Sequence, residues 1–181
     1  MDKVSFRTEQ IKRMNQAAQA TREAGPKLLE ALVALPAWQQ AKVIATTVAS
    51  PMEVPTAPLI EAALAAGKTV LLPRTMPHRQ MAFLPDSGAA SRIISSFGIP
   101  EPPYDEAAVV PKTAIDLIVV PGIAYSLSDH NRVGFGGGYY DRYLADYAGV
   151  TVTLAAPVMT FATPQWPVVN TDIALTHVLT I

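Results

Sequence analysis

Short apolar runs rich in β-branched residues alternate with helical segments along this chain of 181 residues, and that alternation restricts its fold. The runs at 42–49, 69–72 and 115–122 are bounded by proline, glycine or serine, as is typical of buried strands. Strands that alternate with helices over a domain-sized length predict an α/β fold, a three-layer sandwich with a mainly parallel central sheet. We expect a single domain over residues 1–181.

Prolines and glycines set the expected ends of these elements. Lys3 to Ala24 predicts a long helix closed by Gly25-Pro26, and Pro26 can begin a second helix at Lys27–Leu35. The strand at 69–72 is expected to stop at Pro73. The other expected elements are helices at 56–66 and 139–147, strands at 80–84, 150–156 and 173–180, and a surface connection at 97–106.

The composition excludes several classes of protein. Lys and Arg number 14 against 15 Asp and Glu, and this balance argues against an electrostatic nucleic-acid binder. The absence of cysteine excludes disulfides, thiolate metal sites and a cysteine nucleophile. The charged N-terminal segment does not resemble a signal peptide, and the uncharged stretch 147–171 contains three prolines that would break a membrane-spanning helix. We therefore expect a cytoplasmic protein with no membrane partner, as a monomer or small homo-oligomer.

Glycine is concentrated in one segment, RVGFGGGYYDR (132–142), at Gly134, Gly136, Gly137 and Gly138. Glycines at this density allow positive φ and bring backbone N–H groups close to a ligand, a geometry that suits phosphate. Arg132 adds positive charge, and Asp141 adds a carboxylate suited to Mg²⁺. The nucleotide fingerprints GxxxxGK[ST] and GxGxxG do not fit, so a phosphate loop and a tight structural turn both stay open.

The residues that follow the glycines predict a helix with one buried face. Tyr140, Tyr143, Leu144 and Tyr147 have the i, i+3, i+4, i+7 spacing of a core-facing stripe. Tyr139 falls on another face, so we expect it to contact a ligand.

Lys3 and Arg7 are unusual because both positive charges lie near the start of the expected N-terminal helix, one turn apart. Repulsion between them and the positive helix end together cost about 0.5–1 kcal/mol. A bound polyphosphate would reverse the sign of that contribution. A solvated basic face is the alternative interpretation.

The segment RVGFGGGYYDR, preceded by DLIVVPGIAY, closely resembles the signature of the 5-formyltetrahydrofolate cyclo-ligases, or methenyltetrahydrofolate synthetases. The resemblance extends over nearly the whole chain and implies a fold similar to the sugar-phosphate isomerase and CoA-transferase folds. The other matching positions are Lys3 and Arg7 (K-x-x-x-R), Glu53 and Thr56 (E-V-x-T), 67–73 (the following strand), Glu101-Pro102 (E-P) and Asp172.

The resemblance implies an ATP- and Mg²⁺-dependent reaction that closes 5-formyltetrahydrofolate to 5,10-methenyltetrahydrofolate and releases ADP and phosphate. ATP would phosphorylate the formyl oxygen, N10 of the folate would attack the activated carbon, and phosphate would leave. Phosphoryl transfer of this kind needs positioning and charge neutralisation more than a protein nucleophile.

The resemblance also implies roles for individual residues. Metal ligation falls to Asp141 and Asp172, and Glu53 would accept hydrogen bonds from the amino-pyrimidine edge of the pterin. The implied catalytic residues are Lys3, Arg7 and Arg132. The implied ATP-binding residues are those three with Gly134, Phe135, Gly136, Gly137, Gly138, Tyr139 and Tyr140. The implied folate-binding residues are Val48, Glu53, Phe135, Gly136, Gly137, Gly138 and Tyr139.

Several positions depart from the family pattern. Pro55 replaces the Asp or Asn that is common in E-V-x-T, and the segment 125–131 is one residue longer than usual, so Ser126 and Asp129 are both candidates for the family aspartate. Val169 and Thr171 stand where Glu and His are frequent. Two alternatives stay open: a folate- or nucleotide-binding paralogue without turnover, and another phosphate-handling enzyme such as a sugar-phosphate isomerase.

Overall fold

The structure is a computed structural model that describes residues 2–181. Its helices are α1 (Lys3–Gln16), α2 (Ala18–Ala34), α3 (Pro36–Gln40), α4 (Ala57–Ala65) and α5 (Tyr139–Leu144). Its strands are β1 (Val43–Ala45), β2 (Thr69–Thr75), β3 (Met81–Pro85), β4 (Ile93–Ile94), β5 (Pro100–Glu101), β6 (Leu117–Val119), β7 (Ala124–Ser126), β8 (Arg132–Val133), β9 (Val150–Leu154), β10 (Thr160–Phe161) and β11 (His177–Leu179).

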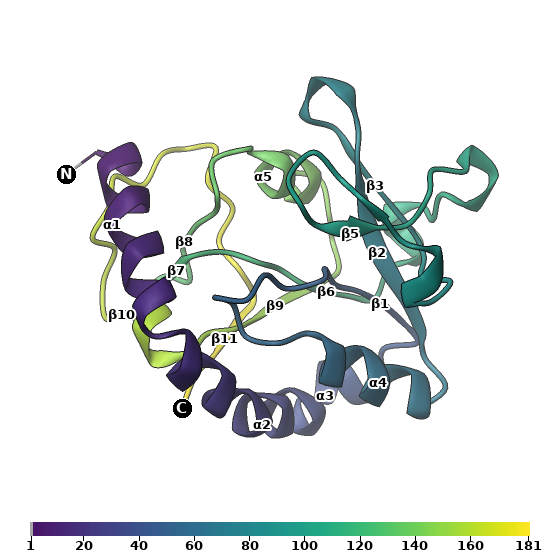
Figure 1. Ribbon diagram of the computed structural model, residues 1–181, viewed down its shortest axis with the longest axis horizontal. Coiled ribbons are helices and arrows are strands. Elements are labelled where there is room, and N and C mark those ends of the chain that lie inside the picture. Colours follow the sequence, from purple (N-terminus) through teal and green to yellow (C-terminus); the bar gives the residue numbers. More distant parts are fainter. Residues whose placement is uncertain (1) are drawn as a thin grey trace.

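Six strands form one central sheet in the order β11-β9-β6-β1-β2-β3 (Figure 1). Every neighbouring pair is parallel except β2 and β3, which are antiparallel. Two smaller sheets, β10-β7-β8 and β4-β5, are separate from it. The predicted α/β fold with a mainly parallel central sheet is therefore confirmed.

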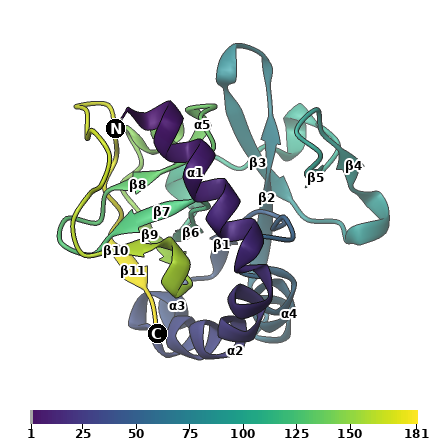
Figure 2. The same ribbon diagram turned by 60° about the vertical axis from the view of Figure 1, so that its left-hand side comes forward.

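Helices lie on both sides of the central sheet. Figure 1 shows α2, α3 and α4 together on one side and α5 on the other. Figure 2 shows α1 beside the small sheet β10-β7-β8. There Phe6 of α1 packs edge-on against Phe161 of β10, with ring centroids 5.6 Å apart. The Nε2 atom of Gln10 donates to the carbonyls of Ile123 and Val158 at 2.9 and 2.8 Å. These contacts fix the position of α1.

The central strands are buried on both faces. Ile44, Leu71, Leu117, Ile118 and Val152 are all fully buried, as expected for parallel strands covered by helices. The carboxyl ends of β1, β6 and β9 point to the same edge of the sheet, because these strands are parallel neighbours. Ligands of open α/β sheets bind at that edge, so the loops that follow these strands are the first place to look for a site.

The helix break predicted at Gly25-Pro26 is wrong. Helix α2 continues through both residues, and the chain breaks instead at Ala17, between α1 and α2. A proline within a helix leaves the carbonyl four residues earlier without its N–H partner. Here both Pro26 and Arg22, which carries that carbonyl, are exposed, so water can satisfy the carbonyl.

The prediction that Pro73 ends its strand is also wrong. Strand β2 continues to Thr75, and Pro73 lies opposite Phe83 of β3. Strand β1 pairs with β2 only as far as Leu71, so Pro73 lies where β2 has a neighbour on one side alone and a missing N–H is tolerated. The expected surface connection at 97–106 contains one buried residue, since Glu101 is 1% exposed.

The remaining expected elements are present; all have shorter bounds than predicted except β3, which is shifted by one residue from the expected 80–84. No helix among residues 2–181 is both long enough and apolar enough to cross a membrane. The uncharged stretch 147–171 forms β9, β10 and irregular chain.

Candidate active site

The glycine-rich segment connects β8 to α5 and lies against α1. Gly136 and Gly138 have φ angles of 105° and 69°, which residues with a Cβ rarely adopt. The Nε of Arg7 donates to the carbonyl of Gly134 at 3.0 Å, and a Cβ added at Gly136 would lie 3.6 Å from that Nε. The Arg7 face of α1 and the glycine segment therefore form one continuous surface.

Each of the two predicted metal ligands forms an ion pair with one predicted nucleotide-binding cation. The Nζ of Lys3 lies 2.6 and 2.5 Å from the two carboxylate oxygens of Asp172. The Nη2 of Arg132 donates to Oδ1 of Asp141 at 2.9 Å. Asp172 therefore neutralises one of the two positive charges at the start of α1.

Arg132 is 5% exposed and joins the glycine segment to the strand ends. Its Nη1 donates to the carbonyl of Pro121 at 3.3 Å, and its guanidinium carbon lies 5.7 Å from the centre of the Tyr140 ring. Its Nε has no hydrogen-bond partner within residues 2–181. A buried guanidinium with a free donor favours an additional acceptor, and phosphate oxygens suit it well.

A small cavity of about 30 Å³ lies at the carboxyl ends of β1, β6 and β9. Pro121 and Gly122 follow β6 and line it, so the cavity adjoins Arg132 through its contact with Pro121. A volume of this size holds little more than one or two polar groups. The other lining residues are Thr46, Thr47, Ala49, Glu53, Val54, Thr56, Val119, Val120, Tyr125, Thr153, Leu154 and Met159.

Glu53 places a buried carboxylate in this cavity. One oxygen, Oε2, accepts from the backbone N–H of Ser50 at 2.9 Å and from its hydroxyl at 2.7 Å. Burial raises the pKa of the Glu53 carboxyl above its ordinary value of 4.5, although both Ser50 hydrogen bonds act in the opposite direction. Burial likewise raises the pKa of the Tyr125 and Tyr140 hydroxyls, so both stay protonated.

The buried stripe predicted on α5 is confirmed. Tyr143 and Leu144 are buried, while Tyr140 and Tyr147 pack against the same core from its border. Helix α5 ends at Leu144, three residues before Tyr147, so the buried stripe extends beyond the helix. The Tyr147 hydroxyl donates to the carbonyl of Ile115 at 3.0 Å.

Tyr139 faces away from this stripe and meets Phe97, a residue that the sequence did not single out. Their rings contact edge-on with centroids 5.7 Å apart, and Phe97 belongs to the turn between β4 and β5. Phe97 and Phe135 are 57% and 45% exposed. The sequence signal for Phe97 is a lone aromatic residue next to Ser96 and Gly98, four residues before the E-P pair.

The remaining predicted positions are placed less centrally. Val48 is half-buried against the core, and its neighbours Thr47 and Ala49 line the Glu53 cavity while Val48 does not. Of the two candidates for the family aspartate, Ser126 is fully buried and Asp129 is exposed.

Asp141 and Asp172 are the carboxylates that would hold a magnesium ion brought by a nucleotide. Residues 2–181 contain no group of three or more His, Asp or Glu side chains able to hold a metal by themselves. Mg²⁺ at nucleotide sites uses one or two carboxylates and completes its shell with phosphate oxygens and water. Asp141 and Asp172 supply that number.

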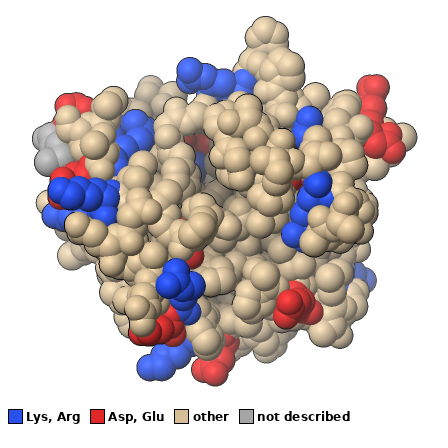
Figure 3. Space-filling model, viewed as in Figure 1, with Lys and Arg blue, Asp and Glu red and all other residues tan. Residues whose placement is uncertain are grey.

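The charged side chains are distributed around the site rather than concentrated on one broad surface. Figure 3 shows Lys and Arg side chains toward the rim of this face, with acidic side chains among them and a hollow near the centre. Recognition of an anion here therefore depends on the few cations described above.

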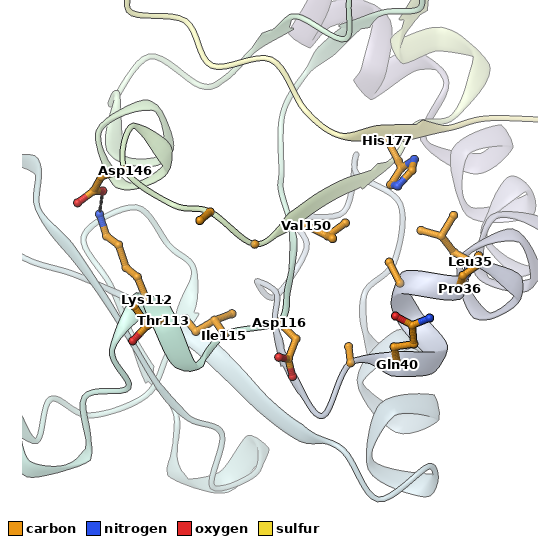
Figure 4. A pocket seen from close by; sticks show the side chains of 14 residues that line it. Leu35, Pro36, Gln40, Lys112, Thr113, Ile115, Asp116, Asp146, Val150 and His177 are labelled. Carbon is orange, nitrogen blue, oxygen red and sulfur yellow. Dashed lines mark hydrogen bonds and ion pairs between the residues drawn. The ribbon is translucent and has the colours of Figure 1, made fainter.

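A much larger depression of about 870 Å³ lies at the opposite, amino ends of the strands (Figure 4). It is lined by Asp116 before β6, by Val150 at the start of β9 and by His177 of β11. Asp116 accepts from the backbone N–H groups of Lys42 and Val43, and so acts as a structural cap. None of the predicted site residues lines it.

Comparison with known proteins identifies the family of the chain. The sequence model described as the 5-formyltetrahydrofolate cyclo-ligase family matches residues 1–181. The chain belongs to this family. The 5-formyltetrahydrofolate cyclo-ligase of Haemophilus influenzae is 31% identical over 148 residues, 78% of this chain and 77% of that protein. The Escherichia coli K12 enzyme is 30% identical over 127 residues, 69% of each chain.

Three further proteins show the extent of the similarity. The probable 5-formyltetrahydrofolate cyclo-ligase of Schizosaccharomyces pombe is 33% identical over 119 residues, and the match spans 64% of this chain and 58% of that longer protein. The solved structure of Aquifex aeolicus 5,10-methenyltetrahydrofolate synthetase superposes with a TM-score of 0.81 at 30% identity, covering 99% of this chain and 90% of that one. The Mycoplasma pneumoniae synthetase shares the fold, with a TM-score of 0.75 at 21% identity and 98% coverage of both chains.

Membership of the cyclo-ligase family confirms the resemblance on which the residue roles were assigned. This family member is thus a ligase-type enzyme. The roles of its individual residues stay predictions.

We expect the buried carboxylate of Glu53 to lower the free energy of unfolding when it is ionised, and this effect can be measured. Because the folded chain holds the Glu53 proton more tightly than the unfolded chain, stability falls as pH rises from 4.5 through the raised pKa, and stays lower above it. We expect Glu53→Gln to increase the free energy of unfolding in neutral buffer and to flatten this pH dependence. Urea unfolding of both proteins in mildly acidic and neutral buffer measures this. Parallel pH profiles would contradict it.

Proposed function

We propose that this chain catalyses the ATP- and Mg²⁺-dependent cyclisation of 5-formyltetrahydrofolate to 5,10-methenyltetrahydrofolate, with release of ADP and phosphate. In this reaction ATP supplies the phosphoryl group that converts the formyl oxygen into a leaving group. N10 of the folate then closes the ring, and the formyl oxygen departs with the phosphate. The observation that carries the proposal is the contact of Arg7 with the glycine segment, together with Arg132, which flanks that segment and reaches Pro121 in the lining of the Glu53 cavity.

The cations bind and orient the polyphosphate. Lys3 and Arg7 project from one face of α1, and the Arg7 contact with Gly134 supports a position directly above the glycine segment. Backbone N–H groups of a glycine segment with left-handed turns are suited to phosphate oxygens. Arg132, held by Asp141 and Pro121, neutralises negative charge as it moves from nucleotide to formyl oxygen.

Glu53 binds the pterin end of the folate. A carboxylate accepts two hydrogen bonds from adjacent N–H groups, and the pyrimidine edge of a pterin presents such a pair. The oxygen Oε1 is not engaged by Ser50, which leaves an acceptor for the ligand. Because the cavity adjoins Pro121, whose carbonyl Arg132 contacts, the formyl group of a folate bound there lies toward the cations.

One assay tests the proposal directly. The purified protein is mixed with 5-formyltetrahydrofolate, ATP and Mg²⁺, and the near-ultraviolet absorbance of the methenyl product is followed. We expect product that requires all three components. The same assay with Arg132→Met, which removes the buried charge with a similar side-chain volume, tests the role of Arg132.

The outcomes separate the candidate functions. Folate and ATP binding without product would favour a paralogue that has lost turnover, and failure to bind 5-formyltetrahydrofolate would contradict the proposal. Product formation by Arg132→Met at the wild-type rate would refute the role of Arg132 while leaving the reaction itself intact.

A further inference from the structure

Thr46 lines the Glu53 cavity, and its hydroxyl is buried without a hydrogen-bond partner within residues 2–181. Thr46 directly follows β1 and is fully buried, and its backbone N–H donates to the carbonyl of Leu71 at 3.0 Å. Its side-chain oxygen is therefore fixed at the carboxyl end of a central strand. A buried hydroxyl without a partner destabilises the folded chain.

Three neighbouring polar groups of the cavity already have partners in the protein. Glu53 accepts from Ser50, the hydroxyl of Thr56 accepts from the N–H of Ala49 at 2.9 Å, and the hydroxyl of Tyr125 donates to the carbonyl of Val120 at 3.3 Å. A ligand that enters the cavity therefore meets in Thr46 a hydroxyl that need not give up a protein partner.

We propose that Thr46 is a specificity-determining residue for the folate: its hydroxyl donates to the carbonyl oxygen of the pterin ring, next to the N–H edge that Glu53 holds. This proposal rests on the proposed function, since it assumes that the pterin enters the Glu53 cavity.

The chemistry of the two residues is complementary. An ionised carboxylate only accepts hydrogen bonds, so Glu53 can satisfy the N–H groups of the pterin but not its carbonyl oxygen. A threonine hydroxyl can donate, and Thr46 lines the same small cavity. The cavity volume of about 30 Å³ suits the polar edge of the ring, and the rest of the folate extends outside it.

The test uses isosteric variants and a matched control from the same chain. Thr46→Val removes the hydroxyl while it keeps the shape, and Thr46→Ser keeps the hydroxyl. Thr21 in α2 provides the control, because its hydroxyl is also buried and without a partner within residues 2–181 but lines a different cavity. Binding of 5-formyltetrahydrofolate without ATP is measured by calorimetry, and thermal unfolding is measured without ligand.

We expect Thr46→Val to weaken folate binding about three- to tenfold, as for the loss of one buried hydrogen bond, while Thr46→Ser and Thr21→Val keep the wild-type affinity. Both valine variants should unfold at a higher temperature than the wild type, since each removes an unpartnered hydroxyl. In this result the hydroxyl of Thr46 contributes to binding and not to stability.

Other outcomes overturn the proposal. If Thr46→Val leaves folate affinity unchanged, or if Thr46→Ser weakens it equally, the hydroxyl does not contact the pterin. If Thr46→Val lowers the unfolding temperature, the hydroxyl is part of the folded core. The proposed function fails separately: wild-type protein that does not bind 5-formyltetrahydrofolate, or a Glu53→Gln variant with unchanged affinity, refutes the pterin site itself.

Discussion

Replacing Asp172 with Asn is expected to change the binding of metal-free ATP and of MgATP in opposite directions. Both Asp172 oxygens contact the Nζ of Lys3, so the two charges neutralise each other. ATP alone can engage Lys3 only by leaving the Asp172 carboxylate unpaired beside its phosphates. When Mg²⁺ is present, Lys3 and Asp172 can each exchange the other for a new partner: Lys3 then binds phosphate and Asp172 binds the metal.

Asp172→Asn frees Lys3 and removes the opposing charge. We expect it to tighten binding of metal-free ATP severalfold, about 1 kcal/mol for a partly exposed ion pair. The same change should weaken MgATP binding by more than about tenfold, since the proposed metal ligand is lost. Calorimetric titrations with ATP, in EDTA and in excess Mg²⁺, measure both affinities without reference to turnover.

A second ion pair provides the control for this experiment. Lys112 and Asp146 pair at the opposite end of the sheet, beside the large depression (Figure 4). Asp146→Asn should leave both ATP affinities unchanged. If Asp172→Asn weakened ATP and MgATP equally, Asp172 would be a structural partner of Lys3, and the exchange of partners would be excluded.

Replacing Gly122 with Ala should destabilise the fold by about 1–3 kcal/mol, the usual effect of an overpacked core. A Cβ at Gly122 would lie 2.9 Å from the hydroxyl of Tyr125 and 3.0 Å from the carbonyl oxygen of Val133. The first atom belongs to a fully buried side chain and the second to the backbone of β8, so neither can move freely. Because Gly122 also lines the Glu53 cavity, folate affinity should fall with stability.

Gly25→Ala is the matched control with the opposite expected sign. Gly25 lies inside α2, and its added Cβ would meet Pro55 Cδ at 3.7 Å, an ordinary contact. Alanine is favoured over glycine within a helix by about 0.5–1 kcal/mol. Urea unfolding of both variants measures the difference. A Gly122→Ala protein as stable as the wild type would mean that β8 shifts readily.

The central sheet and the glycine-rich turn can be predicted from the sequence because both depend on local patterns of residues. Apolar β-branched runs identify the central strands, and the glycine density identifies the turn before α5. The path of the chain at Pro26 and Pro73 depends on what lies beside each proline, an exposed helix face in one case and a missing strand neighbour in the other. The secondary-structure propensity of proline alone does not show which residues or strands lie beside it.

The site was predictable as a set of residues but not as a set of contacts. Lys3 and Asp172 were assigned different roles, nucleotide and metal, and nothing local indicates that they pair across 169 positions. The contact of Phe97 with Tyr139 and the unpartnered hydroxyl of Thr46 likewise depend on tertiary packing. Such contacts join elements that are distant in the sequence.

The pairing of Lys3 with Asp172 also has a consequence for the order of folding. Joining residues so far apart closes nearly the whole chain into a loop, and the entropy of that closure must be compensated by structure already formed between them. We expect this contact to form late, after the central sheet. A nucleotide that recognises Lys3 and Arg7 together with the glycine segment then binds the completed chain and not its folding intermediates. Its affinity adds directly to the stability of that final state.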